Sequence, residues 1–203
     1  MRIGLFGGAF DPITTAHIHI CNYLTKIKSV DEIWILPCYR SGHGKYMTKP
    51  VHRFNMCKIA AKSNNNQKIK VCDFEIKHKI TGSTASVLKQ FYNSSYYTTR
   101  HDDFRFIIGM DNALGIKKWT NYEITLGLIP FIVVNRGDHK YDQNNEWFEK
   151  SPHKYVEMKP PLETSSSQVR DLLQNNLTPK DEKLDKLIDK SVLDYIKIHT
   201  IYF

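Results

Sequence analysis

Long hydrophobic runs are missing from this chain of 203 residues. The longest extends from Leu126 to Val134, is broken by Gly127 and Pro130, and is too short to cross a bilayer. We therefore expect no membrane segment. No low-complexity stretch divides the chain either, and its length suffices for one sizeable core, so we expect a single domain over residues 1–203.

Cysteine is scarce, and the cysteines present lack the spacing of a metal site. They are Cys21, Cys38, Cys57 and Cys72, each within or at the end of an expected helix or strand. The expected first strand begins at Arg2, which leaves no room for a leader peptide. These features favour a cytoplasmic protein with reduced thiols, and a nuclear location is the alternative.

Two common phosphate-binding patterns are also absent. The chain contains neither the G-x-G-x-x-G of dinucleotide folds nor the G-x-x-x-x-G-K-[ST] of P-loops. A stripe of Lys and Arg is missing as well, although the formal net charge is +8. That charge predicts anionic partners, and the dispersal of basic residues among acidic ones favours small phosphorylated molecules over nucleic acid.

The N-terminal segment, in contrast, has the order of a phosphate-binding turn. The apolar run Ile3–Phe6 predicts a buried strand, Gly7 and Gly8 predict a sharp turn, and helical spacing begins near Thr14. The first N–H groups of a helix and its positive dipole end attract anions. His17 would lie in the first turn of that helix. The alternative is a plain tight turn followed by a solvated histidine.

Strand-like and helical runs alternate along the chain. The expected strands are residues 3–6, 32–36, 70–73, 104–108, 131–134 and 155–158. The expected helices are residues 15–27, 51–61 and 83–92, with two more after residue 164. This alternation predicts an α/β fold with a parallel sheet covered on both faces. Ligands then bind beyond the carboxyl ends of the strands, where the loops 7–17 and 109–112 would face each other.

Several motifs resemble the nucleotidyltransferase superfamily and, within it, the bacterial-type nicotinate mononucleotide adenylyltransferases. GGAFDPITTAH at 7–17 is similar to G-G-x-F-D-P followed by [H/T]-x-G-H, with Ala16 in place of glycine. TSSSQVR at 164–170 resembles the closing motif I-S-S-T-x-I-R. Further similar segments lie between and after them: RFNMCKIA (53–60), FIIGMDNALGIKKW (106–119), VVNR (133–136) and VLDYI (192–196). The resemblance covers nearly the whole chain.

The resemblance implies a Rossmann-like, doubly wound parallel sheet with a C-terminal helical extension at about 160–203, all in one nucleotidyltransferase domain. It implies an enzyme that joins ATP and nicotinate mononucleotide into deamido-NAD with release of pyrophosphate. Its small-molecule substrates would be its partners, without nucleic acid or membrane. Mg²⁺ would accompany ATP, held mostly by phosphates and water rather than by protein side chains.

The resemblance also assigns roles to individual residues. Those expected to bind ATP are Gly7, Gly8, Phe10, Thr14, His17, Asp111, Ser165, Ser167 and Arg170. Those expected to bind the mononucleotide are Thr84, Trp119, Arg136 and His43. The expected catalytic residues are His17, Arg170 and Lys45. Without the resemblance, Asp111 could equally be a helix N-cap, Trp119 a core residue and Arg170 a solvated side chain.

The chain departs from the family pattern at two segments. The family's P-P-H-K loop becomes PCYRSGHGK at 37–45. Its S-Y-T-x-D-T-L segment keeps only Thr84 and Leu88, so the sequence does not decide between the acid and the amide form of the substrate.

Three alternative functions would fit some of the same features. A pantetheine-phosphate adenylyltransferase or a cytidylyltransferase would share the fold, but the spacing to Trp119 argues against both. An RNA-binding module would suit the charge and the likeness of T-x-A-H to the H-I-G-H of tRNA synthetases, but the missing basic stripe argues against it.

Overall fold

The computed structural model describes residues 1–40, 46–99, 102–137, 146–158, 164–175 and 182–203. In this part of the chain, one six-stranded sheet has the order β3-β2-β1-β4-β5-β6, and all its neighbouring strands are parallel. The strands are β1 (Arg2–Gly8), β2 (Glu32–Pro37), β3 (Ile69–Val71), β4 (Asp103–Gly109), β5 (Phe131–Asn135) and β6 (Lys154–Glu157). The strand order reverses between β1 and β4, which confirms the doubly wound α/β prediction.

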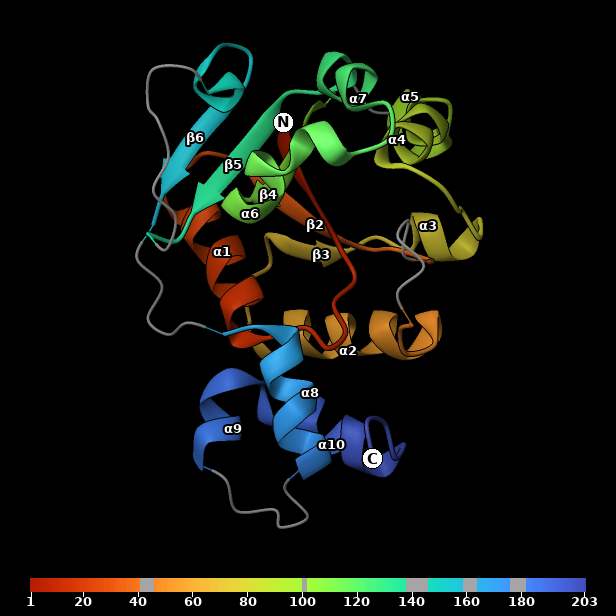
Figure 1. The fold of residues 1–203 in the computed structure, drawn as a ribbon, viewed down its shortest axis with the longest axis vertical. Helices are drawn as coiled ribbons and strands as arrows, with labels where there is room; N and C mark the ends of the chain where they lie inside the picture. The colour runs from red at the N-terminus through yellow and green to blue at the C-terminus, as the bar shows by residue number, and fades with distance from the viewer. Residues whose placement is uncertain (41–45, 100–101, 138–145, 159–163, 176–181) are drawn as a thin grey trace.

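Helices cover both faces of the sheet (Figure 1). The first are α1 (Thr15–Lys26), α2 (Pro50–Ser63), α3 (Phe74–Lys77), α4 (Thr84–Tyr92) and α5 (Ser95–Thr98). Next come α6 (Met110–Leu114), η1 (Ile116–Lys118), α7 (Tyr122–Leu128) and η2 (Trp147–Glu149). The last are α8 (Ser166–Asn175), α9 (Glu182–Leu187) and α10 (Lys190–Ile198), which lie together below α1 and α2 in Figure 1. None of the helices in the described ranges has the length and apolar character needed to span a membrane.

The sheet separates two hydrophobic cores because successive side chains of a strand point to opposite faces. In β5, Ile132 and Val134 join the core under α1, α2 and the C-terminal helices, whereas Phe131 and Val133 join the core under α3, α4 and α6. All four are essentially inaccessible to water. Burial of one such side chain stabilises the fold by roughly 1.5–3 kcal/mol, so the helix layers on both faces stabilise the sheet. A sheet covered on both faces explains why its strands are apolar on both sides.

Three expectations about the elements are wrong. The third strand ends at Val71 rather than Asp73, which instead precedes α3. The expected loop 109–112 is not a loop, since Gly109 ends β4 and Met110 begins the short helix α6. In the part of the C-terminal segment that the structure describes there are three helices rather than the two expected. Helices of four to six residues, such as α3, α6 and α9, complete too few turns for an apolar period to be recognised.

The expected glycine turn after the first strand is also wrong. Gly7 and Gly8 lie within β1, and rings occupy the space of their missing side chains. A Cβ on Gly7 would lie 2.6 Å from the Phe106 ring, and one on Gly8 would lie 3.1 Å from the Phe10 ring. The backbone instead enters the left-handed region at Phe10, with φ of 47°. The glycines therefore admit two aromatic rings, and Phe10 makes the turn.

Candidate active site

The N-terminus of α1 carries the predicted histidine in a fixed geometry. Thr14 is the N-cap residue, and its backbone N–H donates to Nδ1 of His17 at 3.0 Å. The Thr14 hydroxyl lies 2.8 Å from the same nitrogen. Because Nδ1 accepts from a backbone N–H, the ring proton of the neutral imidazole is on Nε2. Nε2 is therefore the nitrogen that can donate to a ligand.

His17 stays neutral at physiological pH. Its ring lies 5.1 Å from the Phe10 ring and 6.0 Å from the Phe6 ring, measured between centroids. Burial among these groups, and then the positive charge of Arg136, lower the pKa of His17 to about 4. Arg136 follows β5, and its charge acts on the imidazole at the start of α1. The low pKa makes His17 a hydrogen-bond donor rather than a cation.

The N-terminus of α8 packs directly on the loop that follows β1. Arg170 donates from Nη1 to the backbone carbonyl of Asp11 at 2.6 Å and from Nη2 to the hydroxyl of Ser167 at 3.0 Å. The Ser166 hydroxyl donates to the Pro12 carbonyl at 2.8 Å. Ser166 is not among the residues predicted to bind ATP, although it belongs to the run of hydroxyls at this helix start. The two motifs at opposite ends of the chain therefore form one structure.

Ser165 acts as the N-cap of α8 in this structure. Its hydroxyl accepts from the backbone N–H of Gln168 at 3.1 Å, as a helix N-cap does. This contact lies at the same helix start as Arg170, so the cap itself orients the first N–H groups of α8. A phosphate role for Ser165, Ser167 and Arg170 stays a prediction.

Asp111 lies at the carboxyl end of β4, next to the strand that leads to His17. It is exposed and occupies the second position of α6, whose N-cap is Gly109, so the N-cap alternative for Asp111 is wrong. A Cβ on Gly109 would lie 2.6 Å from the Asp111 carboxylate. Glycine at this position makes room for the carboxylate to turn back over the end of the strand. Its contact with a ribose stays a prediction.

Two of the residues predicted to bind the mononucleotide, Thr84 and Trp119, come from the other face of the sheet. Thr84 is the first residue of α4, and the Ser83 hydroxyl caps that helix by accepting from the N–H of Ser86 at 3.4 Å. Trp119 follows η1, is half-buried, and packs on the same core as α4. A half-buried ring is neither fully core nor fully free, so its stacking role stays a prediction. The predicted His43 and Lys45 lie outside the described residues.

Comparison with known proteins assigns the family. The model of the cytidylyltransferase-like family matches residues 5–172. A relative from Clostridium acetobutylicum, named a probable nicotinate-nucleotide adenylyltransferase, is 30% identical over 98% of this chain and 97% of its own length. The chain belongs to the nicotinate-nucleotide adenylyltransferases of the cytidylyltransferase-like family.

Solved structures of this adenylyltransferase family agree with the fold over its full length. The nicotinic acid mononucleotide adenylyltransferase of Plasmodium falciparum complexed with NaAD superposes with a TM-score of 0.79 at 28% identity, covering 99% of this chain and 97% of that chain. The same enzyme complexed with APC gives a TM-score of 0.77 at 29% identity, covering 99% and 96%. The resemblance found in the sequence is confirmed.

Arg53 holds together the loops around the site of this adenylyltransferase, and it is not among the residues that the sequence predicted for the site. The side chain is completely buried on α2. It donates to the backbone carbonyls of Thr48 at 2.9 Å, Ala9 at 2.8 Å and Tyr39 at 3.1 Å. One guanidinium thus joins the loop after β1, the loop after β2 and the segment before α2. The signal in the sequence was the helical spacing of Arg53 with Met56, Cys57 and Ala60, which places a charged residue on the buried face of α2.

Glu75 lies beneath the same loops. It is buried, and its carboxylate accepts from the N–H of Tyr39 at 3.4 Å. Burial raises the pKa of Glu75 to about 7, although the Tyr39 N–H and the charge of Arg53 act in the opposite direction. Glu75 and Arg53 therefore both hold the loop after β2 at Tyr39: Glu75 accepts from its N–H, and Arg53 donates to its carbonyl.

Proposed function

We propose that the chain transfers the adenylyl group of ATP to nicotinate mononucleotide and so forms deamido-NAD and pyrophosphate. The 5′-phosphate oxygen of the mononucleotide attacks the α-phosphorus, and the bond from that phosphorus to the pyrophosphate oxygen breaks. No protein nucleophile takes part, so catalysis consists of positioning and charge stabilisation. One observation carries the proposal: a neutral imidazole, its proton fixed on Nε2, beside the loop of the family's first motif.

On the ATP side, His17 donates from Nε2 to an oxygen of the α-phosphate and stabilises the charge that develops there. The groups proposed to surround the phosphates are the backbone of Gly7, Gly8 and Phe10 and the side chains of Thr14, Ser165, Ser167 and Arg170. Asp111 accepts from a ribose hydroxyl. The geometry supports this arrangement because Arg170 already contacts the backbone of Asp11 in the same loop.

On the acceptor side, Arg136 holds the phosphate of the mononucleotide, Trp119 stacks on the pyridine ring and the start of α4 at Thr84 receives the carboxylate. The positive charge of Arg136 lowers the pKa of His17, which supports this assignment. An attacking phosphate held by Arg136 would lie near the α-phosphate held by His17.

Magnesium enters with ATP in this proposal. Within the described ranges, no three His, Cys, Asp or Glu side chains are grouped so that they could hold a metal ion. In the proposal, the ATP phosphates and water hold the ion, and the ion neutralises the departing pyrophosphate. We also propose a cytoplasmic location, since all the cysteines are free thiols.

The test is a pyrophosphate-release assay of the full chain with ATP and a panel of acceptors. Nicotinate mononucleotide should support turnover, with deamido-NAD as the second product, and pantetheine phosphate should not. CTP in place of ATP tests the cytidylyltransferase alternative in the same assay. Turnover with pantetheine phosphate, or with CTP and not ATP, would replace the proposed function.

Arg170→Lys is expected to raise the KM for ATP about tenfold, the equivalent of ~1.4 kcal/mol, and to leave the KM for the mononucleotide nearly unchanged. Lysine keeps the charge but loses the planar fork that reaches Asp11 and Ser167 together. Steady-state kinetics with each substrate varied in turn provide the measurement. Arg105→Lys is the control, because Arg105 lies near the N-terminal end of β4, away from the carboxyl ends of the strands where the site is proposed. An equal rise for both substrates would indicate a general structural role.

A further inference from the structure

Asp11 is a buried carboxylate in the phosphate loop, and both of its oxygens already have partners. It is only 4% exposed. Oδ2 accepts from the backbone N–H of Thr48 at 3.2 Å, and Oδ1 accepts from the hydroxyl of Tyr202. The carboxylate is therefore engaged by two protein segments, one before α2 and one at the C-terminal end of the chain, rather than directed at a ligand.

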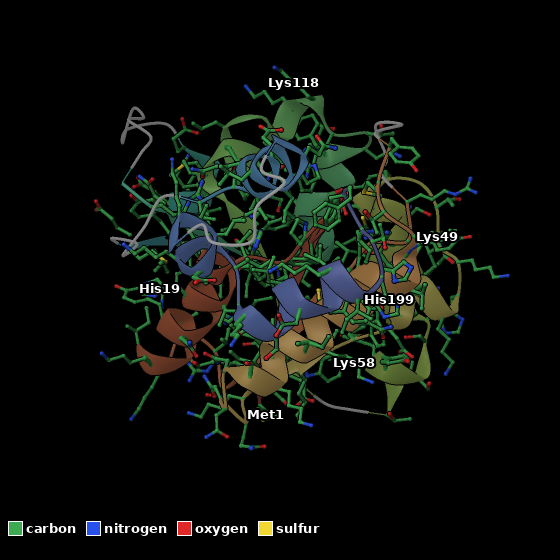
Figure 2. All side chains as sticks on the ribbon, turned by 90° about the horizontal axis from the view of Figure 1, so that it is seen from below. Met1, His19, Lys49, Lys58, Lys118 and His199 are labelled. Carbon is green, nitrogen blue, oxygen red and sulfur yellow. The ribbon has the colours of Figure 1, made fainter. Side chains whose placement is uncertain are left out.

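The hydroxyl of Tyr202 reaches this loop through a specific backbone path. The N–H of Ile201 donates to the carbonyl of Ile196 at 3.0 Å, and the Ile201 side chain is buried. Thr200 and Tyr202 both have left-handed φ, 49° and 70° respectively. These turns reverse the chain after α10. Figure 2 shows the end of α10, marked by His199, on the same side as Lys49, which precedes α2.

The same short stretch of the phosphate loop is held from a second side. The carbonyl of Asp11 accepts from Arg170, and the carbonyl of Pro12 accepts from Ser166, both on α8. Side chain and backbone of one loop thus meet two parts of the C-terminal extension. Removal of any one contact leaves a buried acceptor without its donor, which costs more than the contact itself contributes.

We propose that Tyr202 is a positioning residue for adenylyl transfer: its hydroxyl holds Asp11, and through Asp11 the backbone from Gly8 to Thr14, in the conformation that receives the phosphates of ATP. This inference rests on the proposed function, which places ATP at that loop. Tyr202 itself touches no reacting atom. Burial and then the charge of Asp11 raise the pKa of Tyr202, so the hydroxyl keeps its proton and continues to donate across the pH range of an assay.

Tyr202→Phe removes the hydroxyl, which donates to Asp11 and has a second hydrogen bond with Thr48, and the chain offers a matched control. Tyr195 is in the same C-terminal segment, and its hydroxyl also has two partners, Nδ1 of His52 at 2.9 Å and the amide of Asn55 at 3.0 Å. Those partners lie on α2 and not on the phosphate loop. Tyr195→Phe therefore loses a comparable set of contacts without any effect on Asp11.

Two measurements separate positioning from stability: the dissociation constant of Mg-ATP by calorimetry without mononucleotide, and the KM for each substrate. Tyr202→Phe should weaken Mg-ATP binding about tenfold and lower kcat, with the KM for the mononucleotide within about twofold of wild type. Tyr195→Phe should stay within about twofold throughout. Equal effects of the two variants, or unchanged Mg-ATP binding by Tyr202→Phe, would overturn the proposal.

A second variant keeps the test decisive if Tyr202→Phe does not fold. Asp11→Ala removes both acceptor oxygens and so breaks the contact with Tyr202, and it should show the same selective loss of Mg-ATP binding. In its background, Tyr202→Phe should add less than about a further twofold, because the contact is already broken. Full additivity would overturn the proposal. A wild-type protein that binds Mg-ATP but releases no pyrophosphate would refute the proposed function and leave the loop result intact.

Discussion

His17→Ala is expected to lower kcat by about 10²–10³ while the protein remains folded, because one preorganised donor to the developing charge is lost. The donor is Nε2–H, fixed by the hydrogen bond from the Thr14 N–H to Nδ1. Since the imidazole is already neutral, with a pKa of about 4, the loss should be the same from about pH 6 to pH 8. Single-turnover kinetics with saturating substrates provide the measurement.

His19→Ala is the matched control for this loss of rate. His19 is on the same helix, two residues further on, and lies beside Asn22 and Asn64 in a cavity whose lining does not include His17. It should keep near-normal turnover. His17→Ala also removes the side chain that accepts from the helix N-cap, which costs about 1 kcal/mol of stability, so thermal unfolding must accompany the kinetics. A folded His17→Ala protein with near-normal kcat would remove His17 from the mechanism.

Arg53→Ala is expected to destabilise the fold by about 3 kcal/mol or more, because it leaves three backbone carbonyls and the Glu75 carboxylate without a buried donor or counter-charge. For a chain of this size such a loss lowers Tm by about 6–12 °C. Urea unfolding monitored by tryptophan fluorescence measures the free energy directly.

The control for Arg53→Ala is an arginine at the surface. Arg105 on β4 forms an ion pair with Asp103 at 2.9 Å, in which the Asp103 side chain is 44% exposed. Its replacement by alanine should cost about 1 kcal/mol or less. If both variants lost the same small amount of stability, the hydrogen bonds of Arg53 to the two loops would contribute little, and the loops would be held by other contacts.

Much of the fold was predictable because its strongest signals are local. The runs around Ile107 and Val133 are apolar on both faces, as only a covered parallel strand requires. The start of α1 is marked by Thr14 and His17, and the start of α8 is marked by Ser165. These are helix caps, which need only neighbouring residues. The proposal that phosphates bind at these two helix starts uses the same local signals and stays a prediction.

What could not be predicted depends on partners distant in the chain. The space beside Gly7 is filled by Phe106, from a strand almost 100 residues later, so a glycine needed for packing looked like a glycine needed for a turn. The helical spacing of Arg53 can indicate that it is buried, but its acceptors are backbone carbonyls, which carry no residue identity and so cannot be found from the sequence. The contact of Tyr202 with Asp11 joins residues 191 positions apart. Only the folded chain shows such pairs.

The central claim is that this chain uses the acid form of the mononucleotide, and the ratio of kcat/KM for nicotinate and nicotinamide mononucleotides tests it most directly. The first N–H groups of a helix have no acceptor within it, and in α4 the Ser83 hydroxyl accepts from that of Ser86, so the N–H groups of Thr84 and Ala85 are the ones at the open helix start. A helix start favours an anion. A charge-assisted hydrogen bond is roughly twice as strong as a neutral one. One such contact predicts that the acid is preferred by about tenfold to hundredfold. Equal values, or a preference for the amide, would contradict the claim.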